Sequence, residues 1–241
     1  MPSPKLLPQT PPPLVSYPAA PTARRTAPPR SGGFPPRVRW SRLPVQLGCD
    51  VVFRAAVATA AAERRRPRSV GALASAASPV GIYKDLRNPT LFFTAERSEG
   101  RGAGSTGATR IDREVRGLLQ ERPRCVELEC GLAFPAAGAL PRGAVLRVGR
   151  HRILPAHTSA TVDAYAAYVT PQVSAPASGV LASAMYRGAG EPNLLYFFTW
   201  FRSRADLERH ARSQRLVGTR ARLAETLQER LEVWDVATAW A

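Results

Sequence analysis

The sequence has few cysteines, almost no lysine and no long apolar run. Three cysteines are too few for the disulfide framework of a small secreted domain, and none of the three histidines stands at zinc-ligand spacing from them. No apolar run approaches the roughly 18 residues of a membrane-spanning helix. With 44% apolar and 22% charged residues, the composition is typical of one or two globular domains. We therefore expect no metal centre and no membrane span.

The net charge of +16 suggests a nucleic-acid partner at first sight. Only two of the 34 basic residues are lysines, however, and the many Ala, Pro and Gly residues that accompany the arginines indicate a GC-rich coding bias. No helix-turn-helix, zinc-finger or aromatic RNA-binding signature accompanies the charge. We therefore expect neither a nucleic-acid nor a membrane partner.

Residues 1–44 differ in composition from the rest of the chain. They hold thirteen of the 23 prolines and seven basic residues but no acidic one. Such a segment cannot bury enough apolar surface to offset its ordering entropy, so it is predicted to be a disordered tail. Its composition also resembles that of an organellar transit peptide. The expected location is the cytoplasm, or an organelle if the tail is a targeting signal.

An internal repeat organises the remaining residues. The heptad FFTAERS at 92–98 recurs as FFTWFRS at 197–203, and LQER at 119–122 recurs at 227–230. A Tyr-containing segment closed by Pro precedes each heptad, and a Ser or Thr followed three residues later by Asp predicts a helix start behind it. We expect two units, 45–139 and 140–241, with Phe92 equivalent to Phe197 and Gln120 to Gln228.

Each unit is predicted to run strand, helix, strand, strand, helix, strand, which is the ferredoxin-like order. The expected strands are 46–53, 80–85, 90–97 and 124–134, then 145–154, 180–187, 194–202 and 231–240; the expected helices are 55–66, 110–121, 160–169 ended by Pro171, and 204–228 with a break near 213–218.

Residues 194–201 are apolar at both parities, so both faces of that strand must be covered. Helices can cover one face and a second sheet the other. We therefore predict an α+β fold in which two tandem ferredoxin-like units form, within one chain, the barrel that single units make by dimerising.

Residues 81–98 and 181–213 resemble the antibiotic biosynthesis monooxygenase family, dimeric α+β barrels that include cofactor-free oxygenases of polycyclic phenols and haem-degrading proteins. In that family a strand ends in Trp, one residue and Ser, and a His or aromatic residue follows seven positions after the Ser. The matching positions here are Phe201, Ser203 and His210.

The departures from the family pattern narrow what the resemblance implies. The Asn of the oxygenase members is Phe197 here, and the haem-ligating His of the haem-degrading members falls at about Arg220. In the first half Glu96 and Arg116 stand at the Trp and His positions. A site is therefore expected in the second half, and haem binding is only a third possibility.

The resemblance implies a pocket that binds an electron-rich phenol, stabilises its anion and lets it react with oxygen without a cofactor. His210 is the candidate base because its unperturbed pKa suits proton abstraction near neutral pH. Arg187 and Arg147 are candidates to stabilise the anion. The candidate pocket-lining aromatics are Tyr165, Tyr168, Tyr186, Phe197 and Phe201. The competing interpretation is that the aromatics form the core and that His210 is a half-buried surface residue.

Two functions remain open from the sequence. One is a cofactor-independent, monooxygenase-like enzyme for an aromatic or polyketide-like small molecule. The other is a non-catalytic small-molecule-binding or stress-response module with the same fold, which the departures at Phe197 and Glu96 favour. In both cases we expect a monomer with an internal pseudo-dimer, or a weak oligomer.

Overall fold

A computed structural model describes residues 34–49, 51–53, 55–56, 81–98, 115–134, 140–141, 143–213, 218–219, 221 and 223–238. The strands are β1 (Arg37–Pro44), β2 (Gly81–Asp85), β3 (Leu91–Arg97), β4 (Arg124–Phe134), β5 (Val145–Arg152), β6 (Val180–Gly188), β7 (Glu191–Phe201) and β8 (Glu232–Thr238). The helices are α3 (Thr158–Ser174) and α4 (Arg204–Arg212), with 3-10 turns η1 (Arg116–Leu118), η2 (Pro155–His157) and η3 (Pro176–Ser178).

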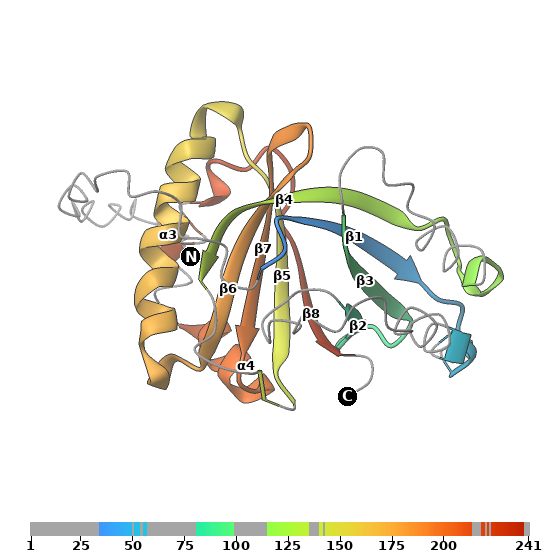
Figure 1. Cartoon of the computed structure of the whole chain (residues 1–241). Helices are drawn as coiled ribbons and strands as arrows, with labels where there is room; N and C mark the ends of the chain where they lie inside the picture. The colour runs from blue at the N-terminus through green and yellow to red at the C-terminus, as the bar shows by residue number, and fades with distance from the viewer. Residues whose placement is uncertain are drawn as a thin grey trace, which may run out of the picture.

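The eight strands close into one barrel in the order β1-β3-β2-β8-β5-β7-β6-β4. Each half contributes a four-stranded antiparallel sheet with the ferredoxin-like order, β4-β1-β3-β2 and β8-β5-β7-β6. The two sheets join where β2 pairs with β8 and β4 pairs with β6. Each edge strand of one half therefore forms its backbone hydrogen bonds with an edge strand of the other. The predicted tandem α+β barrel is confirmed (Figure 1).

The strand that is apolar at both parities, β7, has one face inside the barrel and one outside. Phe198 and Trp200 belong to the central cluster inside the barrel. Phe197 packs on the outer face with Tyr165 of α3, and Phe201 packs there with Leu207 of α4. In Figure 1 α3 lies along the outside of β6, and α4 lies near the ends of β6 and β7. The second-half helices therefore cover the outer face on which the candidate site was expected.

The first barrel strand lies inside the segment that the sequence predicted to be a disordered tail. β1 (Arg37–Pro44) pairs with β3 and β4, and Val38, Trp40 and Leu43 are buried. The first unit therefore starts before residue 45, and residues 34–44 do not belong to a tail; residues 1–33 lie outside the described residues. The high arginine content hid this strand, because Arg37 and Arg39 form ion pairs with Glu129 and Glu127 of β4 instead of marking an unpaired segment.

Some predicted helices and strands in the first half need correction. The strand expected at 46–53 is not formed, because the chain turns at Gly48, whose φ is +84°, and is helical at 51–53. Most of the helix expected at 55–66, and residues 110–114 of the helix expected at 110–121, lie outside the described residues. The described remainder of the latter includes the turn η1.

In the second half α3 continues through Pro171 to Ser174 instead of ending there. A proline in the last turn removes a single backbone hydrogen bond, which the packing of α3 against β6 and β4 outweighs. α4 ends at Arg212, as the expected break near 213–218 required.

Backbone hydrogen bonds test the expected repeat. Gln120 N donates to Pro44 O at 2.8 Å, and Gln228 N donates to Arg152 O at 2.7 Å, so the two glutamines hold the same place in the two halves. Phe92 and Phe197 lie on equivalent strands and on the same face, but their positions along the strand differ by two residues. Phe92 lies opposite Leu43, whereas the position equivalent to Leu43 lies opposite Leu195. Phe92 therefore corresponds to Leu195 and not to Phe197.

Candidate functional site

A hydrogen-bonded hydroxyl group anchors α3 to the outer face of the sheet. The Tyr165 hydroxyl and Ser183 Oγ lie 2.6 Å apart, and Ser183 Oγ lies 2.9 Å from Thr199 Oγ1. Burial raises the pKa of Tyr165, and the hydrogen bonds with Ser183 and Thr199 oppose the rise only in part. Tyr165 is therefore a neutral phenol at physiological pH. The sequence did not indicate Ser183 and Thr199, because a Ser or Thr on a strand gives no signal by itself. Only the packing of α3 brings Tyr165 to them.

Phe197 lies between a tyrosine and a histidine. Its ring centroid is 4.5 Å from that of Tyr165 and 4.5 Å from that of His151 on β5. Gly149 gives His151 room, because a Cβ at that position would stand 3.0 Å from His151 Nε2. Sequence reasoning also missed His151. Alternation along β5 was the available signal, since it places residues 147, 149 and 151 on one face.

The predicted base, His210, lies half-buried between α3 and the end of β7. Its Nε2 is 3.3 Å from the Tyr168 hydroxyl, and its ring centroid is 5.0 Å from that of Phe201. Both neighbours were predicted site residues. The structure therefore brings together a histidine, a phenol and an aromatic ring that are as far as 42 positions apart in the sequence.

The start of α4 positions His210. Ser203 caps the helix by accepting a hydrogen bond from Asp206 N, and its hydroxyl donates to Asp206 Oδ2 at 2.8 Å. This hydrogen bond lowers the pKa of Asp206, with further help from Arg209. Gly179 approaches the cap so closely that a Cβ there would stand 2.4 Å from Asp206 Cγ. The corresponding cap residues of the first half, Thr109 and Asp112, lie outside the described residues.

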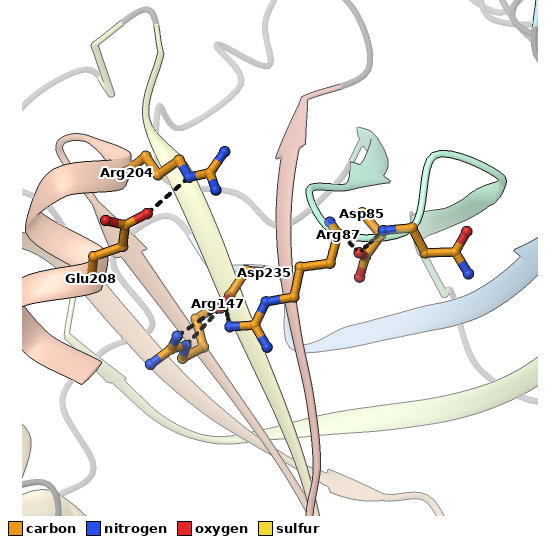
Figure 2. A network of polar contacts seen from close by, with 7 residues as sticks. Asp85, Arg87, Arg147, Arg204, Glu208 and Asp235 are labelled. Carbon is orange, nitrogen blue, oxygen red and sulfur yellow. Dashed lines mark hydrogen bonds and ion pairs between the residues drawn. The ribbon is translucent and has the colours of Figure 1, made fainter. Parts of the chain in front are cut away.

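Arg147 lies in a separate polar network around Asp235 of β8 (Figure 2). Its Nε and Nη2 donate to the two carboxylate oxygens of Asp235 at 2.6 and 3.0 Å, and Arg87 adds a third hydrogen bond at 2.8 Å. Arg87 follows β2, so the network joins the first half to the second. The turn that carries Arg87 is held by Asp85, which accepts from the backbone N–H groups of Arg87 and Asn88 at 2.7 Å.

An open pocket of about 240 Å³ lies beside this network. Its lining residues are Arg87, Arg147, Ala211, Leu231 and Val233. His210 is not among them, although its neighbour Ala211 is. Sequence reasoning predicted Arg147 but missed Arg87, because only the closure of the barrel brings the turn after β2 to β8.

Two predicted site residues lie elsewhere. Tyr186 points into the barrel, where its hydroxyl donates to Pro35 O at 3.1 Å and burial raises its pKa. It cannot line a pocket beneath the helices, because β6 turns that residue to the inner face. Arg187 follows it on the outer face, where its Nε lies near the backbone of Gly131 in β4. These contacts place it beside β4 and not beside His210.

Two further observations concern the described residues alone. They contain no helix that is long and apolar enough to cross a membrane. They also contain no cluster of three or more His, Cys, Asp or Glu side chains arranged to hold a metal ion.

Comparison with known proteins identifies the fold. No protein-family model and no curated protein sequence matches the chain. Among solved structures, a candidate monooxygenase from Lactobacillus acidophilus shares 11% identity and a TM-score of 0.60, covering 83% of this chain and 92% of that one. A candidate monooxygenase from Fusobacterium nucleatum gives 9% and 0.64, covering 85% and 92%. An anthrone oxidase-like protein gives 11% and 0.55, covering 83% and 91%.

The chain shares their α+β barrel fold. Because each match covers more than four fifths of both chains, the likeness extends over both halves of the barrel. The fold implied by the family resemblance is thereby confirmed. At identities this low the likeness concerns the fold and leaves the chemistry to be argued from the site.

Proposed function

We propose that this α+β barrel is a monooxygenase-like enzyme that oxidises a phenolic small molecule without a bound cofactor. The contact between Tyr168 and His210 carries the proposal. It places an imidazole nitrogen 3.3 Å from a phenol, half-buried beside Phe201, in the layer between the helices and the sheet. A histidine held by a phenol in this way is oriented for proton transfer with a substrate.

In the proposed reaction His210 takes the acidic proton of the substrate, from a phenol or from the CH₂ group of an anthrone, and Tyr168 holds the imidazole ring in place. The substrate anion then supplies the electrons that reduce oxygen. For an anthrone-type substrate, the CH₂ group loses two hydrogens and gains one oxygen atom as a carbonyl, and the second oxygen atom leaves as water. Phe201 packs against the His210 ring, and Phe197 lies further along β7 against Tyr165, so the surroundings of the site are aromatic, which favours an aromatic substrate. The name of the anthrone oxidase-like neighbour recommends anthrone as the first assay substrate.

Three variants test the proposal by oxygen consumption and product absorbance with anthrone. His210→Ala should lower turnover by roughly 10²–10⁴-fold, the usual contribution of a general base. His157→Ala is the matched control, because it removes an exposed imidazole outside this cluster and should leave turnover unchanged. Tyr168→Phe removes only the hydroxyl next to His210. It should shift the pH dependence of turnover while leaving substantial activity.

Turnover that survives His210→Ala, or that falls equally in His157→Ala, would refute the role of His210. Arg116 is not a suitable control, although the family pattern in the first half places it at the His position. Leu118 O and Thr226 O accept equivalent backbone hydrogen bonds, from Gln46 N and Leu154 N. Counted back two residues from each, Arg116 is equivalent to Ala224, which follows α4 and does not lie on it.

One observation favours the alternative of a non-catalytic binding module. The pocket beside β8 is lined by two arginines but not by His210. A module of this kind would bind an aromatic ligand with unchanged affinity in His210→Ala and would show no oxygen consumption with any phenol tested. Equilibrium binding measured beside turnover distinguishes the two functions.

A further inference from the structure

The two halves of the barrel carry equivalent ion pairs that differ in their surroundings. Arg39 and Glu127 hold the same positions in the first half as Arg147 and Asp235 do in the second, opposite each other on paired strands. The first pair makes one contact of 3.9 Å, with side chains that are 23% and 47% exposed. The second makes two hydrogen bonds of 2.6 and 3.0 Å, with side chains that are 11% and 4% exposed. The first pair is therefore the looser and more exposed of two equivalent cross-strand ion pairs.

The second pair has an additional cation and an unused donor. Arg87 reaches Asp235 with one nitrogen, while its side chain is 72% exposed. Arg147 Nη1 is buried and has no hydrogen-bond partner among the described residues. A buried donor without an acceptor is unfavourable, so an acceptor brought to it would be bound with a gain in free energy. At the first pair the position equivalent to Arg87 is Gly190, in the turn after β6, so a glycine stands there in place of a second arginine.

The pocket above this network has the lining that an organic acid requires. Arg87 and Arg147 are the polar residues of its lining, and Ala211, Leu231 and Val233 are the apolar ones. Asp235 and Asp85 touch this network but do not line the pocket, and Asp85 Oδ1 is occupied by two backbone N–H groups. Figure 2 shows the Arg87 and Arg147 side chains converging on Asp235. Asp235 therefore holds the two arginines in place, while the charged residues of the pocket lining are the arginines alone.

We propose that this pocket binds the carboxylate of a small organic acid, with Arg87 and Arg147 donating hydrogen bonds to it. A guanidinium group matches the two oxygens of a carboxylate, and the apolar side chains suit a ring or short chain behind it. The volume of about 240 Å³ is below the ~300–1,000 Å³ of sites for drug-sized ligands, so the pocket takes one small acid or one acidic end of a molecule. The proposal does not depend on the proposed oxygenase function. The pocket is lined by Ala211 of α4 and not by His210, the proposed base.

Titration of the full-length protein with benzoate tests the proposal, with benzamide as the uncharged ligand of the same shape. Benzoate should bind and benzamide should bind at least about tenfold more weakly, because hydrogen bonds to a charged group are lost. Arg87→Gln should weaken benzoate binding by about tenfold. Because its side chain is mostly exposed, this variant should fold normally. Arg39→Gln, in the equivalent pair of the first half, should leave benzoate binding unchanged.

A double variant, Arg147→Gln with Asp235→Asn, removes the buried charges together and so avoids leaving one unpaired. It should abolish benzoate binding while its far-UV circular dichroism stays that of the parent. If it does not fold, the comparison of Arg87→Gln with Arg39→Gln decides by itself. Benzamide binding as tightly as benzoate, equal losses in Arg87→Gln and Arg39→Gln, or no benzoate binding at millimolar concentrations would overturn the proposal.

Discussion

Replacing Trp40 with alanine should destabilise the barrel strongly, because this residue lies at the centre of the inner cluster. Trp40 is 2% exposed. Its ring centroid is 5.1 Å from that of Phe93 and 5.2 Å from that of Phe198, so it connects the two halves across the barrel. If residues 1–44 were a tail, the same change would have no effect. The substitution therefore separates the tail interpretation from the barrel.

Truncation of a buried Trp to Ala costs about 3–5 kcal/mol, from lost burial and from the cavity left behind. For a chain of this size each kcal/mol lowers the Tm by roughly 2–4 °C, so we expect a fall of about 6–20 °C. Trp40→Phe should cost far less, within about 1.5 kcal/mol. It keeps a large ring and removes the indole N–H, which is buried and has no hydrogen-bond partner among the described residues.

Denaturant and thermal unfolding followed by far-UV circular dichroism measure both effects. Leu47→Ala is the control, since Leu47 is 84% exposed and close in sequence, and it should change stability by no more than about 0.5 kcal/mol. Equal stabilities of Trp40→Ala and Leu47→Ala would refute the reasoning and return residues 34–44 to the tail.

Three further outcomes are expected. Ser203→Ala should destabilise the protein by about 1 kcal/mol in urea unfolding, since it removes the cap of α4; an unchanged midpoint would contradict the role of the cap. The Ser203 hydroxyl lowers the pKa of Asp206 below its ordinary 3.8, so the stabilisation by Asp206 is complete above that value and is lost as the pH falls through the lowered pKa. The stability difference between the parent and Asp206→Asn should therefore shrink from pH 7 to pH 2, and a difference independent of pH would argue against it. Sedimentation should find a monomer or a weak oligomer, because the sheet edges are paired within the chain; a tight dimer through open strand edges would show otherwise.

The sequence alone determined the elements whose signals are local. The seven strands from β2 to β8 were predicted within a few residues, because most of their apolar runs end at Gly, Pro or polar turns. The matching pair Gln120 and Gln228 was visible as a repeated LQER. The doubly apolar β7 also required cover on both faces, and this requirement predicted the barrel before any contact was known.

Other features depended on tertiary contacts. β1 carries three arginines and a proline, and it is a strand only because β3 and β4 pair with it on both sides. Phe92 and Phe197 share a sequence motif but differ in register by two residues, because alignment of identical letters carries no information about the partner strand.

The residues of the candidate site also divide into those that the sequence indicated and those that only tertiary contacts brought together. His210 and its neighbours Tyr168 and Phe201 were predicted from the family resemblance, and all three lie within one unit. The Arg87, Arg147 and Asp235 network joins residues as far as 148 positions apart and forms only where β2 pairs with β8. Tyr186 was placed in the site by its residue type, but strand parity turned it into the barrel. Local periodicity therefore set which elements form, whereas pairing between the halves decided which side chains meet.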